Sequence, residues 1–291
     1  MSIPMNSLCV ECRLCKDLDT ARSLGTDEQA TAFAREHMRL FLQMDEDENS
    51  SYFGARIEEL FARIYGVDAD RYRTQKEESN RFVLQRLEYL RQQVKVAADP
   101  VYAALQFAVL GNYIDFSALR GEVSFQVLDD MLRDALKMEL DKEIYETFLR
   151  DLQKGKKLLY ITDNAGEIVF DRILAEVLQE KYPHLEILFC VRGGPVSNDA
   201  TREDAQVAGI GFPVIDSGCA IGGTVIRCLG QEAKQALDDA DVILAKGMGN
   251  IESMYGCGYN VYYAFLVKCQ RFIQFFQKPK MTPLFLRDPG K

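Results

Sequence analysis

The chain has 291 residues, of which 47% are hydrophobic and 27% are charged, and its formal net charge is −9. This composition is typical of a globular protein with one large domain or two unequal domains. The negative charge disfavours a nucleic-acid-binding protein, because such proteins need a basic face. It allows a small anionic substrate, since local charge can oppose net charge.

The sequence also indicates a cytoplasmic protein with no membrane partner. No apolar run approaches the ~20 residues that span a bilayer. The first residues, MSIPMNSLCVECRLCKD, lack the apolar segment of a secretory signal. We therefore expect the eight cysteines to be reduced thiols, because disulfides are rare in the cytosol.

Helical patterns fill the first part of the chain, where apolar residues recur at three- and four-residue spacing. Helices are predicted over residues 27–44, 53–65, 71–96, 128–140 and 142–153, with another that begins at Pro100. A proline suits that place because the first turn of a helix does not need its missing N–H group. We expect a mainly helical domain over residues 1–125.

After residue 155 the pattern changes to short apolar runs that alternate with amphipathic segments. The runs are KKLLYIT, LEILFCVR, FPVID, DVILAKG, NVYYAFLVK and TPLFLRD. Strands that alternate with helices indicate a mainly parallel sheet with helices on both faces. The predicted fold class is therefore α/β, with a doubly wound, mainly parallel sheet domain over residues 126–291 that binds metal and substrate.

Polar clusters follow three of the predicted strands. They are Asp163 and Asn164 after the first run, Asn198 and Asp199 after the second, and Lys246, Gly247, Gly249 and Asn250 after the fourth. Ligands of open parallel sheets sit beyond the carboxyl ends of the strands, so all three clusters are expected at one edge. Each cluster alone is also explained by a turn or a helix cap, and the functional interpretation depends on their sharing that edge.

The residue types in these clusters are those of a metal-dependent phosphoryl site. The side-chain oxygens of Asp163 and Asn164 are hard ligands of the kind that Mg²⁺ and Mn²⁺ prefer. A helix that begins near Gly166 would aim its free N–H groups at an anion. Lys246 would add a cation beside Gly247, where the backbone can approach a ligand closely.

Several strings of the sequence resemble the damage-control phosphatase family, also known as domain of unknown function eighty-nine. They are DNAGEIVFD (163–171), PVSNDATREDA (195–205), AKGMGNIESM (245–254), LVKCQ (266–270) and, in the helical half, GNYIDFSAL (111–119). Together they span most of the chain in the order of the family. The resemblance implies a helical domain packed on a doubly wound α/β domain. It also implies a house-cleaning enzyme that hydrolyses phosphate esters of sugars and damaged metabolites.

The resemblance further implies roles for individual residues. The positions that match the metal ligands of the family are Asp163, Asn164 and Asp199, and the metal would be Mn²⁺, Mg²⁺, Co²⁺ or Ni²⁺. Glu167 and Lys246 would lie next to the substrate phosphate and act with Asp163 in catalysis. The other residues expected to contact the substrate are Asn112 and Asp115, from the helical half, and Gly166, Gly247 and Asn250.

The string CVECRLC near the N-terminus contains Cys9, Cys12 and Cys15. Its Cys-x-x-Cys step, Cys9 and Cys12, resembles the shorter, microbial-type branch of the family. These two cysteines are candidates for a structural metal site, which needs four ligands. With Cys15 as the third ligand, Cys269 would complete the set of four if the N-terminus folds back. The alternative is that the cysteines bind nothing.

The leading prediction is a metal-dependent phosphatase that hydrolyses small phosphate monoesters, with a small phosphorylated metabolite as its partner. The general base is not assigned, and Asp163 could instead act as a covalent nucleophile. Two alternatives stay open. One is a carboxyl methyltransferase that uses S-adenosylmethionine on the same fold, and the other is a non-catalytic protein that binds a metabolite or a metal.

Overall fold

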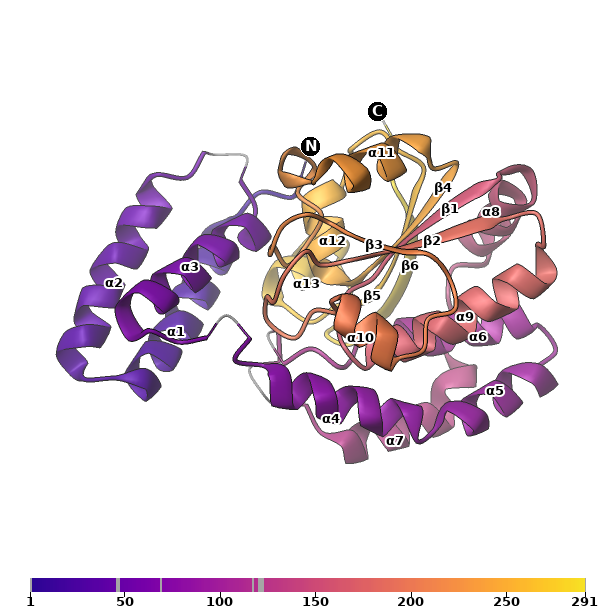
Figure 1. Ribbon diagram of the computed structural model, residues 1–291, viewed down its shortest axis with the longest axis horizontal. Helices are drawn as coiled ribbons and strands as arrows, with labels where there is room; N and C mark the ends of the chain where they lie inside the picture. The colour runs from indigo at the N-terminus through magenta and orange to yellow at the C-terminus, as the bar shows by residue number, and fades with distance from the viewer. Residues whose placement is uncertain (1, 46–47, 69, 117, 120–122, 291) are drawn as a thin grey trace.

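The computed structural model describes residues 2–45, 48–68, 70–116, 118–119 and 123–290 (Figure 1), and within these residues a six-stranded sheet lies at the centre. Its strands are β1 (Lys157–Ile161), β2 (Glu186–Val191), β3 (Val214–Asp216), β4 (Val242–Lys246), β5 (Val261–Leu266) and β6 (Pro283–Arg287). Their order is β3-β2-β1-β4-β5-β6, and neighbouring strands are parallel except for β5 and β6. The predicted α/β class is therefore confirmed.

The direction of strand addition reverses beside β1. The chain builds β2 and β3 on one side of β1 and then adds β4 and β5 on the other. Such a reversal leaves a crevice outside the carboxyl ends of the two central strands, because their connections run to opposite faces. The polar clusters at residues 163–164 and 246–250 follow these two strands, so the fold positions them at the crevice.

Helices cover both faces of the sheet, because successive residues of a strand point to opposite sides. In β1, Leu158 and Tyr160 belong to one hydrophobic core, and Leu159 and Ile161 belong to the other. The first core holds α6 (Pro100–Gly111) and α9 (Glu167–Lys181). The helices over the second core are α11 (Gln231–Asp239), α12 (Gly247–Met254) and α13 (Gln270–Phe276), and the connections also contain α10 (Arg202–Val207) and η2 (Ile226–Cys228).

A second layer of helices packs outside α6 and α9, along the lower side of Figure 1. Its members are α4 (Arg73–Leu84), α5 (Leu87–Val96) and α7 (Phe125–Asp134) with the short η1 (Ala135–Lys137). Helix α8 (Lys142–Lys154), at the upper right of Figure 1, instead packs directly on the sheet near β6. These helices share one continuous hydrophobic core with the sheet.

The prediction of a single helix over residues 71–96 was wrong, because the helix breaks at Arg86. The backbone N–H of Arg86 donates to the carbonyl of Val83 at 2.9 Å, which tightens the turn. The freed carbonyl of Phe82 accepts a hydrogen bond from the Arg86 guanidinium at 2.9 Å. The same guanidinium binds both carboxylate oxygens of Asp129 in α7, at 2.6 and 2.7 Å. A tertiary ion pair thus stabilises the break.

The first three helices form a separate unit at the left of Figure 1. They are α1 (Ser7–Leu24), α2 (Asp27–Leu42) and α3 (Ser50–Tyr65). Each begins at a side-chain cap, because Asn6, Thr26 and Asn49 accept hydrogen bonds from the first free N–H groups. Their own small core includes Phe33 and Phe61, whose rings stack 4.5 Å apart. This unit contacts the sheet domain through α12 and α13.

The predicted division into residues 1–125 and 126–291 stays a prediction, because shared cores describe packing and not independent folding. No helix within the described residues is long and apolar enough to cross a membrane.

The close packing of α6 on α9 depends on Gly111. A Cβ at this position would lie 2.6 Å from Cδ2 of Phe170, a ring that is fully buried in the core. We expect Gly111→Ala to lower the free energy of unfolding by ~1–3 kcal/mol, because the buried ring has little room to move. Urea unfolding monitored by circular dichroism measures this.

Gly211→Ala is the matched control, since a Cβ there meets no described atom within 4 Å. Equal losses of stability in the two variants would contradict the packing argument.

Candidate active site at the ends of strands β1 and β2

The loops that follow β1 and β2 are joined by backbone hydrogen bonds. The N–H of Ala200 donates to the carbonyl of Asp163 at 2.7 Å, and the N–H of Ala165 donates to the carbonyl of Asn198 at 2.9 Å. Asn164 and Asp199 form an isolated antiparallel bridge between the same loops. The structure therefore brings together the first two polar clusters of the sequence at one edge of the sheet.

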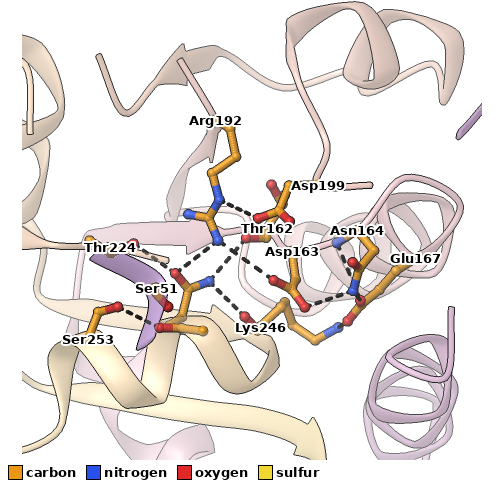
Figure 2. A network of polar contacts seen from close by, with 12 residues as sticks. Ser51, Thr162, Asp163, Asn164, Glu167, Arg192, Asp199, Thr224, Lys246 and Ser253 are labelled. Atoms are coloured by element: carbon orange, nitrogen blue, oxygen red, sulfur yellow. Dashed lines mark hydrogen bonds and ion pairs between the residues drawn. The ribbon is translucent and has the colours of Figure 1, made fainter. Parts of the chain in front are cut away.

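Arg192, the residue after β2, holds the two carboxylates of this site. Its Nε donates to Oδ2 of Asp199 at 2.7 Å, and its Nη2 lies 3.6 Å from Oδ1 of Asp163 (Figure 2). Nη2 also donates to Oδ1 of Asn250 at 3.2 Å. All these side chains are buried, so the ion pairs are screened little by water.

One arginine does not neutralise this pair of acids. Burial raises the pKa of Asp163 well above its ordinary value, and the charges of Asp199 and Glu167 raise it further. Burial also raises the pKa of Asp199, against the opposing charge of Arg192. A divalent cation would favour the ionised form of both carboxylates. The acids therefore suit a metal site in which Asp163 and Asp199 are ligands.

Asn164 carries a third oxygen that could complete this set of candidate ligands. Its Nδ2 donates to Oδ2 of Asp163 at 2.7 Å and to Oε2 of Glu167 at 2.8 Å. With its nitrogen turned to these carboxylates, the amide has its oxygen available for a cation. Two carboxylates and one amide oxygen are hard ligands that suit Mg²⁺ or Mn²⁺, so the residues present fit such a metal.

Lys246 lies behind this set and is fully buried. Its Nζ donates to Oε1 of Glu167 at 2.6 Å, to Oδ1 of Asp171 at 2.8 Å and to the carbonyl of Ala108 at 2.7 Å. Burial alone would lower the pKa of Lys246, but Asp171 and Glu167 outweigh this and hold it above its ordinary value. All three ammonium protons thus have acceptors in the protein. The direct contact with substrate phosphate that the sequence suggested is not made in this arrangement.

Two other predicted residues, Asn112 and Asn250, form hydrogen bonds to the residues of this set or to the backbone beside them. Nδ2 of Asn112 donates to Oδ2 of Asp163 at 3.0 Å and to Oε2 of Glu167 at 3.1 Å. Asn250 donates to the carbonyls of Thr162 and Lys246, at 3.1 and 2.7 Å. These two side chains are fully buried and hold the loop and Arg192 in place.

The two predicted glycines give the backbone its shape at the site. Gly247 has a φ of +80°, and a Cβ there would lie 1.9 Å from Oδ2 of Asp163, so only glycine leaves room for that carboxylate. Gly166 also has a φ of +80°, and its N–H donates to Oδ1 of Asn80 at 2.6 Å. The N–H of Gly166 is therefore bonded to helix α4. The sequence had predicted that this N–H would contact an anion.

A cavity of about 620 Å³ opens beside the carboxylates. The predicted residues that line it are Asp115, Asp163, Asn164 and Asp199. Lys268, after β5, also lines it and donates to Oδ2 of Asp115 and to the carbonyl of Asn112, both at 2.6 Å. Burial would raise the pKa of Asp115, but Lys268 and the N–H of Ala118 outweigh burial and hold it below its ordinary value. An ionised Asp115 and Lys268 therefore face the cavity together.

Three residues at this site escaped the sequence analysis. Arg192 and Lys268 each follow a strand, so the rule that placed the other clusters could have found them. Ser197 lines the cavity with a positive φ of 48°, which is uncommon for a residue other than glycine. Its buried Oγ has no hydrogen-bond partner among the described residues. No sequence pattern signals that geometry.

The cysteines near the N-terminus lie at the far side of the same cavity. Cys9, Cys12, Cys15 and Cys269 all line it, so the N-terminus does fold back towards Cys269. Across the described ranges, no group of three or more His, Cys, Asp or Glu side chains is arranged to hold a metal. A structural metal at Cys9 and Cys12 stays a prediction. The candidate set at residues 163, 164 and 199 is of another kind, because one of its three candidate ligands is an amide.

The chain is similar to several known proteins. The family model described as the damage-control phosphatase ARMT1-like domain matches residues 5–282. An uncharacterized protein of Methanocaldococcus jannaschii is 33% identical over 270 residues, which cover 87% of this chain and 84% of that protein. A damage-control phosphatase of Pyrococcus horikoshii is 33% identical over 192 residues, which cover 65% of each chain. A damage-control phosphatase of Archaeoglobus fulgidus is 32% identical over 211 residues, or 70% of each chain.

The fold has a relative among solved structures. The crystal structure of a DUF89 family protein from Pyrococcus horikoshii superposes with a TM-score of 0.84 at 25% sequence identity. The superposition covers 98% of this chain and 99% of that one, so the helical part and the sheet domain are both shared.

Removal of Lys246 tests whether it compensates the buried acids. Lys246→Ala would leave Glu167 and Asp171 buried without their cation, which typically costs ~3–5 kcal/mol of folding free energy. We expect a loss of that size in a denaturant titration.

The matched control is Lys157→Ala, which removes an exposed lysine that lies 3.2 Å from Asp239. Exposed pairs contribute less than ~1 kcal/mol. The structural role of Lys246 would be refuted if its variant were as stable as the control.

Proposed function

The chain belongs to the damage-control phosphatase ARMT1-like domain family, and from this premise we propose that it is a metal-dependent phosphatase of small phosphate monoesters. The observation that carries the proposal is the pair of buried carboxylates, Asp163 and Asp199, at the wall of a cavity. Two archaeal relatives are named damage-control phosphatases, which supports hydrolysis of phosphorylated metabolites. The same names favour a phosphatase over a carboxyl methyltransferase.

Asp163, Asn164 and Asp199 would hold the divalent metal, which would be Mn²⁺, Mg²⁺, Co²⁺ or Ni²⁺. When bound, it would supply positive charge for the phosphoryl oxygens and a place to orient water. Arg192 and Asn112 keep the two aspartates in position through the hydrogen bonds described above.

Lys268 is the cation that we assign to the substrate phosphate. Its Nζ donates to the carbonyl of Asn112 and to Asp115, which leaves one ammonium proton for a ligand in the cavity. Ser197 would add a hydroxyl, since its Oγ has no partner among the described residues and the residue lines the same cavity. Phosphoryl transfer depends mainly on such positioning and electrostatic stabilisation.

Glu167 and Lys246 act as positioning residues in this proposal. Lys246 fixes Oε1 of Glu167, while Oε2 accepts hydrogen bonds from Asn112 and Asn164. This chain of contacts engages the amide nitrogen of Asn164, so its oxygen would be available to hold the metal. Both residues therefore influence hydrolysis through the metal ligands and not through the phosphate.

We infer that the substrate is a small phosphorylated metabolite met in the cytoplasm, with no nucleic-acid or membrane partner. A cavity of about 620 Å³ is of the size that holds small molecules. Within the described ranges none of the eight cysteines is joined in a disulfide, which is in keeping with a reducing compartment.

Removal of one charge at a time tests the metal site. Asp163→Asn and Asp199→Asn keep the side-chain shape but remove the ionised ligand. We expect phosphate release in the presence of Mn²⁺ or Mg²⁺ to fall at least ~100-fold, because the phosphoryl charge loses its stabilisation. The assay measures inorganic phosphate from a panel of sugar phosphates, and chelation of the metal should stop the intact protein as well.

Asp216→Asn is the control, because Asp216 ends β3 on the surface, where it pairs with Arg202. It should retain the activity of the unaltered chain. Full activity in either site variant, or activity that survives chelation, would rule out the metal assignment.

A further inference from the structure

The cavity extends well beyond the proposed metal ligands. One wall is formed by α1 and α3, and the opposite wall includes residues of α12 and α13. Four basic residues also line the cavity: Arg13, Lys16, Arg271 and Lys280. The part of the cavity that they line is named the far end. A phosphate group alone would occupy only a small part of a cavity of about 620 Å³. The far end therefore has both room and positive charge for another part of the substrate.

Arg13 lies in the cavity wall and has N–H groups without an acceptor among the described residues. Its Nε lies 3.3 Å from Oδ2 of Asp17, an oxygen that also contacts Nε2 of His37 at 3.1 Å. Nη2 of Arg13 is buried and has no hydrogen-bond partner among the described residues, whereas Nε has the ion-pair contact with Asp17. A Cβ at Gly54 would lie 3.3 Å from Nη2, so α3 has a gap where the guanidinium sits. An anion that accepted these N–H groups would remove the cost of leaving them unpaired.

Arg271 repeats this feature on the opposite wall. Its Nε is buried and has no hydrogen-bond partner within the described part of the chain. Its guanidinium lies 5.5 Å from the ring of Phe275, which supports the side chain from one side. Arg13 and Arg271 both influence the pKa of the buried Glu252, so they lie in the same part of the cavity wall. Arginine binds planar carboxylates and tetrahedral phosphates in a fork, so this part of the wall suits such an anion.

Lys16 connects this region to the metal end of the cavity. The pKa of Lys16 is lowered to about 8, mainly by burial and then by the charge of Arg13, while Asp17 and Asp115 act in the opposite direction. Because Asp115 influences Lys16, the basic region and the Asp115–Lys268 pair lie within electrostatic range of each other.

The basic residues at the far end outnumber the acidic residues that line the same walls of the cavity. Glu58 binds Arg71 at 2.8 Å, and burial raises the pKa of Glu252 to about 7, so this residue carries only part of its charge near neutral pH. Glu11 also lines the cavity but is exposed. Four basic residues thus line these walls with three acids, and Asp17 pairs with one of the four, Arg13.

We propose that Arg13 and Arg271 bind a second anionic group of the substrate, a carboxylate or a phosphate, at the end remote from the hydrolysed phosphate. The inference rests on the proposed phosphatase function and narrows its substrate class to phosphate monoesters with two anionic ends.

Matched esters test the proposal on the intact chain. Glucose 6-phosphate has a neutral far end, 6-phosphogluconate has a carboxylate there, and glucose 1,6-bisphosphate has a phosphate. We expect kcat/KM to be at least ~10-fold higher for one of the two esters with a second anion than for glucose 6-phosphate. A hydrogen bond to a charged group stabilises a complex by enough free energy for a change of that size. The preferred member of that pair identifies the group as a carboxylate or a phosphate.

Variants then assign the preference to the arginines. Arg13→Ala and, separately, Arg271→Ala should each reduce the ratio of kcat/KM values by ~10-fold, and Arg13→Lys should restore part of it. Arg22→Ala, on the same helix but with a side chain that is 61% exposed, should leave the ratio as it is. A ratio near one in the unaltered chain, or a ratio that both alanine variants leave intact, would overturn the proposal.

The design separates this inference from the proposed function. If no ester is hydrolysed, the proposed function fails, and calorimetric titration of the same esters in the presence of Mg²⁺ tests the second site alone. Tighter binding of an ester with two anionic ends, lost in Arg13→Ala, would support the site. Equal affinity for all three esters would refute it.

Discussion

The burial of like charges at the ends of β1 and β2 is the constraint on which the rest of the site depends. Asp163, Asp199 and Glu167 lie close together away from water, where carboxylates repel one another strongly. Two buried cations reduce this repulsion from opposite sides, since Arg192 binds Asp199 and Lys246 binds Glu167. Asp163 is the acid that these contacts compensate least. The protein thus maintains an unfavourable charge arrangement that a divalent metal would relieve, which is typical of functional sites.

Each part of the fold contributes to keeping these acids in place. The backbone bonds between the two loops set the spacing of the aspartates, and α6 ends where Asn112 can reach Asp163. Helix α4 anchors the start of α9 through the hydrogen bond between Asn80 and Gly166. Helices α1 and α3 form the outer wall of the cavity. The similarity to a DUF89 family structure extends over 98% of the chain and so includes these distant segments.

The alternation of apolar runs and helices was sufficient to predict the sheet, and the strand-end rule was sufficient to group Asp163, Asn164 and Asp199. The sequence could not reveal where Lys246 points, because its direction depends on a tertiary contact. Its Nζ donates to Asp171, which lies one turn after Glu167 in α9. It missed α1, whose buried residues are the small or polar Cys9, Asp17 and Ala21. It also missed the helix break at Arg86, because the ion pair with Asp129 joins residues 43 positions apart. Local patterns carry no information on such tertiary contacts.

The most direct test of the account is the anomalous diffraction from a crystal of the intact protein grown with Mn²⁺. We predict one strong peak within about 2.0–2.6 Å of oxygens from Asp163, Asn164 and Asp199, the distances typical of hard divalent ions. A metal bound by other residues, or a crystal that contains Mn²⁺ with no peak between these three side chains, would contradict the account.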